Sequence, residues 1–208
     1  MEQLSFFSAE ASGPRIDDLA GVLCGHGRLV SFGRTAARLS VLVGDRWRAR
    51  VLLGEFALRG VRAEVVTGED GGLLVRTAFR ADLLPMSVAW ECAGGSRGPG
   101  ASEKAVPPGF HLDGAVLRLW ALASGWRAEK GYVLPLDEEA PETHEPLAAA
   151  LRGSGLGGKT LGPRAGGPAI RVSGRRRLAT LGELVGKAPP EAELAWPEEI
   201  PARRAEAS

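Results

Sequence analysis

The feature that most constrains the fold is a repeat within the chain. Between Leu52 and Leu83, seven residues have an identical residue 95 positions later, and no gap is needed to align them. Apolar types agree as well, since Phe56 aligns with Leu151 and Val75 with Ile170. Such a repeat predicts two units of the same topology related by an approximate two-fold axis. The identical pairs are Leu52 and Leu147, Gly60 and Gly155, Gly71 and Gly166, Gly72 and Gly167, Arg76 and Arg171, Arg80 and Arg175, and Leu83 and Leu178.

Hydrophobic periodicity predicts the same order of elements in both halves, helix–strand–strand–helix–strand–strand–helix. The expected fold class is therefore α+β, with two αββαββα repeats. In the first half we expect helices over Ile16–Leu23, Trp47–Leu58 and Leu83–Glu91, and strands over Arg28–Phe32, Arg38–Val43, Arg62–Val66 and Leu73–Phe79. In the second half we expect helices over Asp113–Ser124, Glu145–Leu151 and Arg177–Val185, and strands at Trp126–Arg127, Tyr132–Leu136 and within Lys159–Ser173.

The 208 residues divide into two repeats, a linker and a tail. Residues 1–93 form the first repeat and residues 109–187 the second. Residues 94–108 are a Gly/Pro linker, because Gly, Ser and Pro dominate there and no apolar periodicity remains. Residues 188–208 are rich in Pro, Glu and Ala, which predicts a mobile tail anchored only by Trp196. The first helices align at a spacing of 98 rather than 95, which predicts one small insertion.

Small residues recur along the first helix of each half. Leu19–Gly27 reads LAGVLCGHG, and Leu117–Gly125 reads LRLWALASG. Small side chains on an apolar helix allow two helix backbones to approach closely. We therefore expect these two helices to form the seam between the halves, with contacts from Ala20, Gly21 and Gly25 to Ala121 and Ala123.

The first of these stretches resembles the signature helix of the LAGLIDADG homing endonucleases. The second is more similar to the corresponding helix of the WhiA sporulation regulators, whose N-terminal domain is LAGLIDADG-like and does not cleave. SFFSAE at Ser5–Glu10 is also similar to the way WhiA proteins begin. The resemblance covers roughly residues 5–187 and implies a saddle of strands whose concave face lies on duplex DNA. The residues that match are Leu19, Ala20, Gly21 and Gly27 in the first stretch and Leu117 and Gly125 in the second.

The residues that would carry nuclease chemistry are missing. The resemblance implies that the last acidic residue of each motif binds the metal ions for phosphodiester hydrolysis, and such hard cations need charged oxygen ligands. His26 and Ser124 occupy those positions, and Cys24 and Leu122 occupy the earlier acidic ones. No P-loop, dinucleotide-binding fingerprint or nucleophile elbow replaces them. We therefore expect no catalytic residue, no metal site and no cofactor, and hence a protein that is not an enzyme.

Two windows of the sequence are basic, although the net charge is only +1. One runs from Arg28 to Gly54 with Asp45 as its only acid, and the other lies between Glu145 and Glu183 with no acid. Strand alternation turns Arg76 and Arg171 away from the core. Arginines paired on a saddle would contact phosphates and bind duplex DNA with weak specificity. The candidate DNA-binding residues are Arg28, Arg34, Arg38, Arg76, Lys159, Arg164, Arg171 and Arg175.

Two other interpretations of these charges remain open. The basic residues can be ordinary solvent-exposed side chains of a protein whose charges nearly balance. Alternatively, the saddle can be derived from a DNA-binding surface and now bind a partner protein as an interaction module. The sequence has neither a signal peptide nor an apolar run of about 18 residues, and Cys24 and Cys92 lack the spacing of a metal site. We therefore expect a cytoplasmic, nucleoid-associated monomer with reduced thiols and no membrane partner.

The N-terminal QLSFF matches the short peptide with which bacterial proteins dock on the DNA sliding clamp. In that peptide a glutamine is followed by apolar residues that end in phenylalanine, here Gln3, Leu4, Phe6 and Phe7. The alternative is that Phe6 and Phe7 pack on the core of the protein itself, because pentapeptide matches often arise by chance. The sequence leaves both interpretations open.

Overall fold

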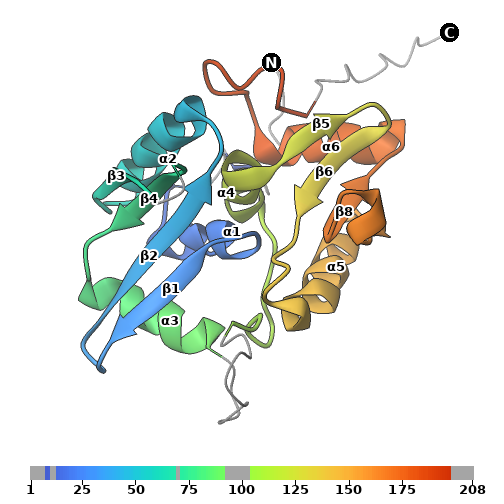
Figure 1. Cartoon of the computed structure of the whole chain (residues 1–208). Helices are drawn as coiled ribbons and strands as arrows, with labels where there is room; N and C mark the ends of the chain where they lie inside the picture. Colours follow the sequence, from blue (N-terminus) through green and yellow to red (C-terminus); the bar gives the residue numbers. More distant parts are fainter. Residues whose placement is uncertain (1–7, 10–12, 69–70, 92–103, 198–208) are drawn as a thin grey trace, which may run out of the picture.

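Two four-stranded antiparallel sheets form the front of the molecule in Figure 1, and their strand orders are the same. This computed structural model describes residues 8–9, 13–68, 71–91 and 104–197. The first sheet has the order β1-β2-β4-β3, with β1 (Arg28–Phe32), β2 (Ala36–Val43), β3 (Ala63–Thr67) and β4 (Leu73–Thr77). The second sheet has the order β5-β6-β8-β7, with β5 (Trp126–Ala128), β6 (Gly131–Pro135), β7 (Lys159–Leu161) and β8 (Ala169–Val172).

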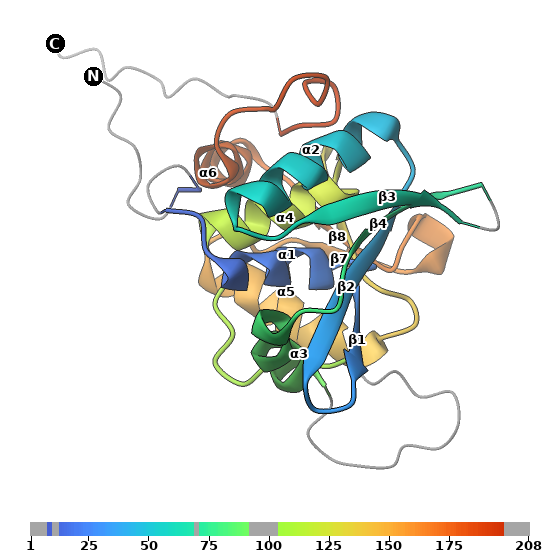
Figure 2. The ribbon, with the colours of Figure 1, turned by 90° about the vertical axis from the view of Figure 1, so that its left-hand side faces the viewer.

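The helices lie behind both sheets, as the two perpendicular views of Figures 1 and 2 agree. The order αββαββα occurs twice, as predicted, and the ends of the elements differ only slightly from the expected ones. The first repeat contains α1 (Ala20–Leu23) after a 3-10 turn at Ile16–Leu19, α2 (Arg46–Leu58), and α3 (Leu84–Trp90) after a 3-10 turn at Ala81–Leu83. The second contains α4 (Gly114–Ser124), α5 (His144–Gly153) after a 3-10 turn at Pro141–Thr143, and α6 (Arg175–Val185), with a 3-10 turn at Pro163–Ala165 between β7 and β8.

The register of the strands shows two changes of length where the sequence predicted one insertion. The spacing between equivalent residues is 98 in β1 and β5, 93 in β2 and β6, and 95 in β4 and β8. The second repeat is therefore shorter in its first hairpin and slightly longer before its middle helix. The prediction of a single insertion is wrong. The equivalent rows of paired residues are Arg28, Ser40, Arg76 and Glu64 in the first sheet, and Trp126, Val133, Arg171 and Lys159 in the second.

One continuous apolar core joins the two repeats. In β2, the side chains of Leu39, Val41 and Val43 face this core and alternate with outward ones, as period-two patterning predicts. Trp120 and Tyr132 are the largest fully buried side chains, and both belong to the second repeat. Within the described residues, no helix is long and apolar enough to cross a membrane.

The repeats approach each other closely where α1 lies against α4. The helices run in the same direction, since Gly21 faces Val116 and Gly25, one turn further along, faces Ser124. A Cβ atom on Gly21 would lie only 2.0 Å from the Val116 carbonyl oxygen. The predicted seam is therefore confirmed. The atoms nearest to the two glycines belong to Val116, Leu119, Trp120 and Ser124 of α4, which the sequence did not single out for the seam. The contacts with Ala121 and Ala123 stay a prediction.

A buried ionic network joins the two repeats beside α1 and α4, which we call the central helices. Asp18 accepts a hydrogen bond from Arg59 at 3.0 Å. Glu55 accepts from Arg59 at 2.7 Å and from Arg118 of α4 at 2.9 Å. Burial alone would raise the pKa of Glu55, but the hydrogen bonds from Arg118 and Arg59 hold it below its ordinary value. The carboxylate therefore stays ionised between two arginines, one from each repeat.

Part of the segment that was expected to be a mobile tail is packed on the domain. Trp196 is 2% exposed, and its indole nitrogen donates to the Gly186 carbonyl at 2.8 Å. The guanidinium of Arg118 lies 5.2 Å from the indole ring, and Arg127 donates to the Trp196 carbonyl. Trp196 is thus an anchor, as the sequence predicts, and residues 188–197 follow it onto the core.

The close approach at the seam makes Gly21 difficult to replace. Gly21→Ala is expected to lower the free energy of unfolding by about 3 kcal/mol, because the clashing Val116 oxygen is main chain and cannot swing aside. Gly54→Ala is the matched control: Gly54 lies within α2 and a Cβ atom there meets nothing within 4 Å, so alanine should add about 0.5–1 kcal/mol. Urea denaturation measures both, and similar effects of the two substitutions would contradict the close approach.

Candidate functional site

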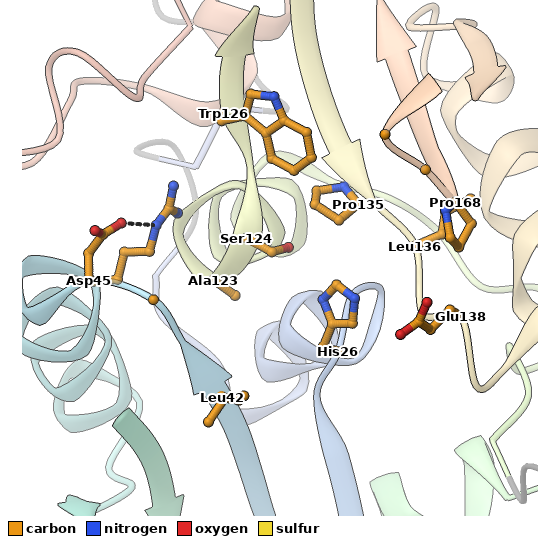
Figure 3. A pocket seen from close by; sticks show the side chains of 14 residues that line it. His26, Leu42, Asp45, Ala123, Ser124, Trp126, Pro135, Leu136, Glu138 and Pro168 are labelled. Atoms are coloured by element: carbon orange, nitrogen blue, oxygen red, sulfur yellow. Dashed lines mark hydrogen bonds and ion pairs between the residues drawn. The ribbon is translucent and has the colours of Figure 1, made fainter. Parts of the chain in front are cut away.

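A cleft of about 380 Å³ opens between the two sheets, and equivalent residues of the two repeats line it. His26 follows α1 and Ser124 ends α4, at the repeat spacing of 98, while Asp45 and Glu138 are related by the spacing of 93 found in β2 and β6. In Figure 3, His26 and Ser124 lie in the middle of the cleft, with Asp45 and Glu138 on opposite sides. The cleft therefore lies on the approximate two-fold axis.

The residues of this cleft do not fit the divalent metal ions that the LAGLIDADG resemblance implies. His26 is exposed and Ser124 donates to the Trp120 carbonyl at 3.4 Å. Asp45 is paired with Arg48 at 3.3 Å. In the part of the chain that the structure describes, no three His, Cys, Asp or Glu side chains gather closely enough to hold a metal ion. An imidazole, a hydroxyl, an acid already paired with arginine and the single carboxylate of Glu138 on the opposite side are a poor ligand set for hard cations.

Arg48 of α2 places a buried positive charge at the carboxyl end of α4. Its guanidinium donates to the carbonyls of Ala121 at 3.2 Å, Leu122 at 2.7 Å and Gly125 at 2.6 Å. The carbonyl end of a helix carries partial negative charge, so a cation is stabilised there. Arg48 thus joins the first repeat to the end of the central helix of the second.

Lys104 makes the equivalent contact at the other central helix. Its ammonium donates to the carbonyls of Gly25 and Gly27. Gly27 and Gly125 are equivalent at the spacing of 98, so a side-chain cation binds the same carbonyl in each repeat. Each cation also pairs with an acid, Arg48 with Asp45 and Lys104 with Asp137, so both acids are already engaged by a side-chain cation.

Asp137 neutralises this positive charge from the second repeat. It lies 2.9 Å from the Lys104 ammonium and also pairs with Arg28, which in turn contacts Glu139. Burial alone would raise the pKa of Asp137, but Lys104 and Arg28 hold it low. Burial lowers the pKa of Lys104, and the Asp137 charge offsets this in part. Arg28, a predicted DNA contact, therefore forms ion pairs that join the first repeat to the second.

The sequence did not reveal Lys104 as part of this site. Lys104 falls inside the segment 94–108 that was predicted to be a linker, yet it is buried. A little further along, Phe110 packs against Trp90 with ring centroids 5.3 Å apart. The chain from Lys104 onward thus belongs to the fold, because its contacts are with residues distant in sequence that a local Gly/Pro composition does not reveal.

The outer faces of the two sheets differ in charge. Arg76 and Arg171 both face away from the core, as strand alternation predicts, and they occupy equivalent positions. Arg76 forms an ion pair with Glu64 on the neighbouring strand at 2.8 Å. Arg171 lies directly opposite Lys159 in the equivalent pairing. The second sheet therefore has two adjacent cations where the first has a neutral pair.

The remaining predicted site residues are spread around these faces. Arg38 is partly exposed and stacks over Phe79, with its guanidinium carbon 4.7 Å from the ring centroid. The other three are exposed on different elements, Arg34 in the β1–β2 turn, Arg164 in the turn between β7 and β8, and Arg175 at the start of α6. Gln3, Leu4, Phe6 and Phe7 of the predicted clamp peptide lie outside the described residues, as does Cys92.

Two solved structures share this arrangement. The homing endonuclease I-WcaI bound to its DNA recognition sequence matches with a TM-score of 0.59 at 14% identity, over 84% of this chain and 81% of that one. The N-terminal LAGLIDADG domain of DUF199/WhiA matches with a TM-score of 0.51 at 13% identity, over 85% and 83%. The chain has a LAGLIDADG-like fold. No family model and no curated protein matches the sequence, so the likeness is one of architecture.

Within this LAGLIDADG-like fold, Lys104 should be a major source of stability. Lys104→Met is expected to lower the free energy of unfolding by about 3 kcal/mol, because two glycine carbonyls would lose their buried cation and Asp137 would keep only the half-exposed Arg28. Lys130→Met is the control, since Lys130 is exposed in the β5–β6 turn. Thermal unfolding measures both variants. A melting temperature equal to that of the wild type for Lys104→Met would contradict the role of this cation.

Proposed function

We propose that this chain is a non-catalytic protein that binds duplex DNA across the outer faces of its two sheets. The observation that carries the proposal is the pairing of Lys159 with Arg171 on the second sheet. Like charges directly opposite each other destabilise a sheet, and a phosphate backbone lying on them removes this repulsion. The pairing of Lys159 with Arg171 therefore supports the interpretation that this surface binds a polyanion rather than facing solvent alone.

The first sheet is proposed to contribute less to the affinity for phosphate. Glu64 neutralises Arg76 there, and Asp137 and Glu139 hold Arg28. Arg34 and Arg38 are the cations of this sheet that form no ion pair with an acid of the described residues, and Arg164 and Arg175 extend the basic surface of the second repeat. Binding is therefore expected to be salt-sensitive and centred on the second sheet.

The absence of catalysis is proposed from the chemistry of the cleft. His26 and Ser124 replace the acids that the family uses, and Arg48 and Lys104 place fixed positive charge on the helix carbonyls beside them. Hydrolysis of a phosphodiester by metal ions needs carboxylates that attract those ions. A DNA-binding fold without this chemistry suits transcription regulation or DNA replication and repair, in a nucleoid-associated protein.

The related structures support the DNA proposal at the level of fold. I-WcaI is described as bound to its DNA recognition sequence, and its fold is shared here over most of the chain. The rival function is a protein-interaction module derived from the same saddle, with no affinity for DNA. Binding of a random duplex at low salt distinguishes the two functions, because only a DNA-binding protein is expected to bind it.

The charged pair on the second sheet gives a direct test. Lys159→Ala with Arg171→Ala is expected to weaken binding of a 20-base-pair duplex about tenfold at low salt, and to reduce the slope of log affinity against log salt by about one for each phosphate that the protein no longer neutralises. Fluorescence anisotropy of a labelled duplex over a salt series measures both quantities. Arg76→Ala should have a smaller effect because Glu64 already pairs with Arg76.

Arg152→Ala is the matched control for this experiment. Arg152 is exposed, paired with Glu145, and carried by α5 behind the second sheet. Its replacement should leave affinity and salt slope unchanged. No binding by the wild type at low salt would overturn the DNA proposal and leave the interaction module. Cleavage of the duplex in Mg²⁺ or Mn²⁺ that disappears in His26→Ala would overturn the non-catalytic part.

We also propose, from the sequence alone, that the N-terminal peptide docks on the DNA sliding clamp. A peptide of residues 1–10 is expected to compete with a known clamp-binding peptide for the purified clamp, because its phenylalanines fill an apolar cleft while Gln3 makes polar contacts. Replacing Phe6 and Phe7 by alanine should abolish the competition. Equal competition by the wild-type and alanine peptides would refute specific docking.

A further inference from the structure

An aromatic surface lies at the turn end of the β1–β2 hairpin. Val30, Phe32 and Phe79 are 46%, 68% and 41% exposed, and the two phenylalanine rings lie 5.6 Å apart between centroids. Val30 pairs with Arg38 across the hairpin, so these residues share the outer face that also carries Arg76. We call Val30, Phe32, Arg38 and Phe79 the aromatic tip. It is an apolar surface on a face proposed to meet DNA.

A cation is built into this surface. The Arg38 guanidinium stacks on the Phe79 ring at 4.7 Å, and Arg34 is exposed in the turn that follows Phe32. A stacked guanidinium keeps its N–H donors free at the ring edge, where they can reach a phosphate. The aromatic tip therefore offers ring faces and phosphate-binding donors side by side.

The size of the tip argues against a protein partner. Two phenylalanines with these exposures present on the order of 200 Å² of aromatic surface. A stable protein interface needs about 800 Å² from each partner. A nucleobase is of matching size, and bases stack on aromatic side chains whatever their sequence. Bases within an intact duplex already stack on their neighbours, so a base that can use the tip must be unpaired.

We infer that the aromatic tip binds unpaired DNA bases by stacking on Phe32 and Phe79, with Arg38 and Arg34 on the adjoining phosphates. This inference rests on the proposed DNA binding. It identifies the DNA substrate as a duplex that continues into a single strand. In Figure 1 the β1–β2 turn points away from the second sheet. The tip thus lies at the far end of the first sheet, where a single strand extending from a duplex bound across the sheets would reach it.

The test compares two DNA probes and one double variant. The probes are a blunt 20-base-pair duplex and the same duplex with a 10-nucleotide single-stranded extension. The variant, Phe32→Leu with Phe79→Leu, removes both rings but keeps apolar side chains, so the fold is retained. The wild type is expected to bind the extended probe about tenfold more tightly than the blunt one, and the variant to bind both probes equally. Fluorescence anisotropy measures both affinities.

A second readout follows stacking itself. A 2-aminopurine base placed in the extension should lose fluorescence when the wild type binds, and should keep it when the double variant binds. Leu58→Ala is the control, since Leu58 is a large exposed apolar side chain at the end of α2, outside the tip. It should behave as the wild type in both measurements.

The outcomes separate this inference from the function on which it rests. If the wild type binds neither probe at low salt, the proposed DNA binding itself fails. If it binds both probes equally, or if the double variant weakens both equally, DNA binding stands and the stacking inference is overturned. A change from dimer to monomer in the double variant by sedimentation, with unchanged DNA affinity, would instead assign the tip to self-association and also overturn the inference.

Discussion

The contact of α1 with α4 at Gly21 is the constraint on which the other features of this fold depend. No side chain separates the two backbones there, because the Val116 carbonyl already occupies the place of a Cβ atom. Helices that run in the same direction at this distance end side by side, so both sets of free carbonyl groups point toward one cleft. The seam thus concentrates partial negative charge on the approximate two-fold axis, and that charge requires a cation.

Two side chains supply the cations. Arg48 and Lys104 bind the equivalent carbonyls of Gly125 and Gly27, each reaching across from outside the helix that it caps. The carbonyl ends of both helices are therefore neutralised by side-chain cations, and Asp137 balances the charge of Lys104. The consequence is a rigid centre. Removing one member of a buried ionic cluster is destabilising, so Arg48, Lys104 and Asp137 hold the two repeats together beside the cleft.

Local periodicity in the sequence predicted the repeat, the order of its elements and the outward direction of Arg76 and Arg171, because each depends only on neighbours along the chain. The seam was also predicted, from Ala20 and Gly21. The contacts of Arg48 and Lys104 were not, since carbonyl groups 70 or more positions away leave no mark on a local pattern. The pairing of Arg76 with Glu64 and the exposure of Phe32 depend on strand register. The spacing between equivalent residues of the two repeats changes twice along the chain, so the sequence alone did not give that register.

The duplication explains why the two sheets can differ. Glu64 and Lys159 are equivalent, and the change from an acid to a base turns a neutral pair with arginine into two adjacent cations. The first sheet carries two exposed phenylalanine rings, whereas the second carries one exposed indole, Trp126, beside the buried Val133, and its hairpin is short. Because the core and the seam are held by other residues, these substitutions on the outer faces cost the fold little. On the function proposed above, a pseudo-symmetric scaffold with unlike faces would bind an asymmetric nucleic acid in one orientation, with its phosphates on the second sheet and its unpaired bases on the first.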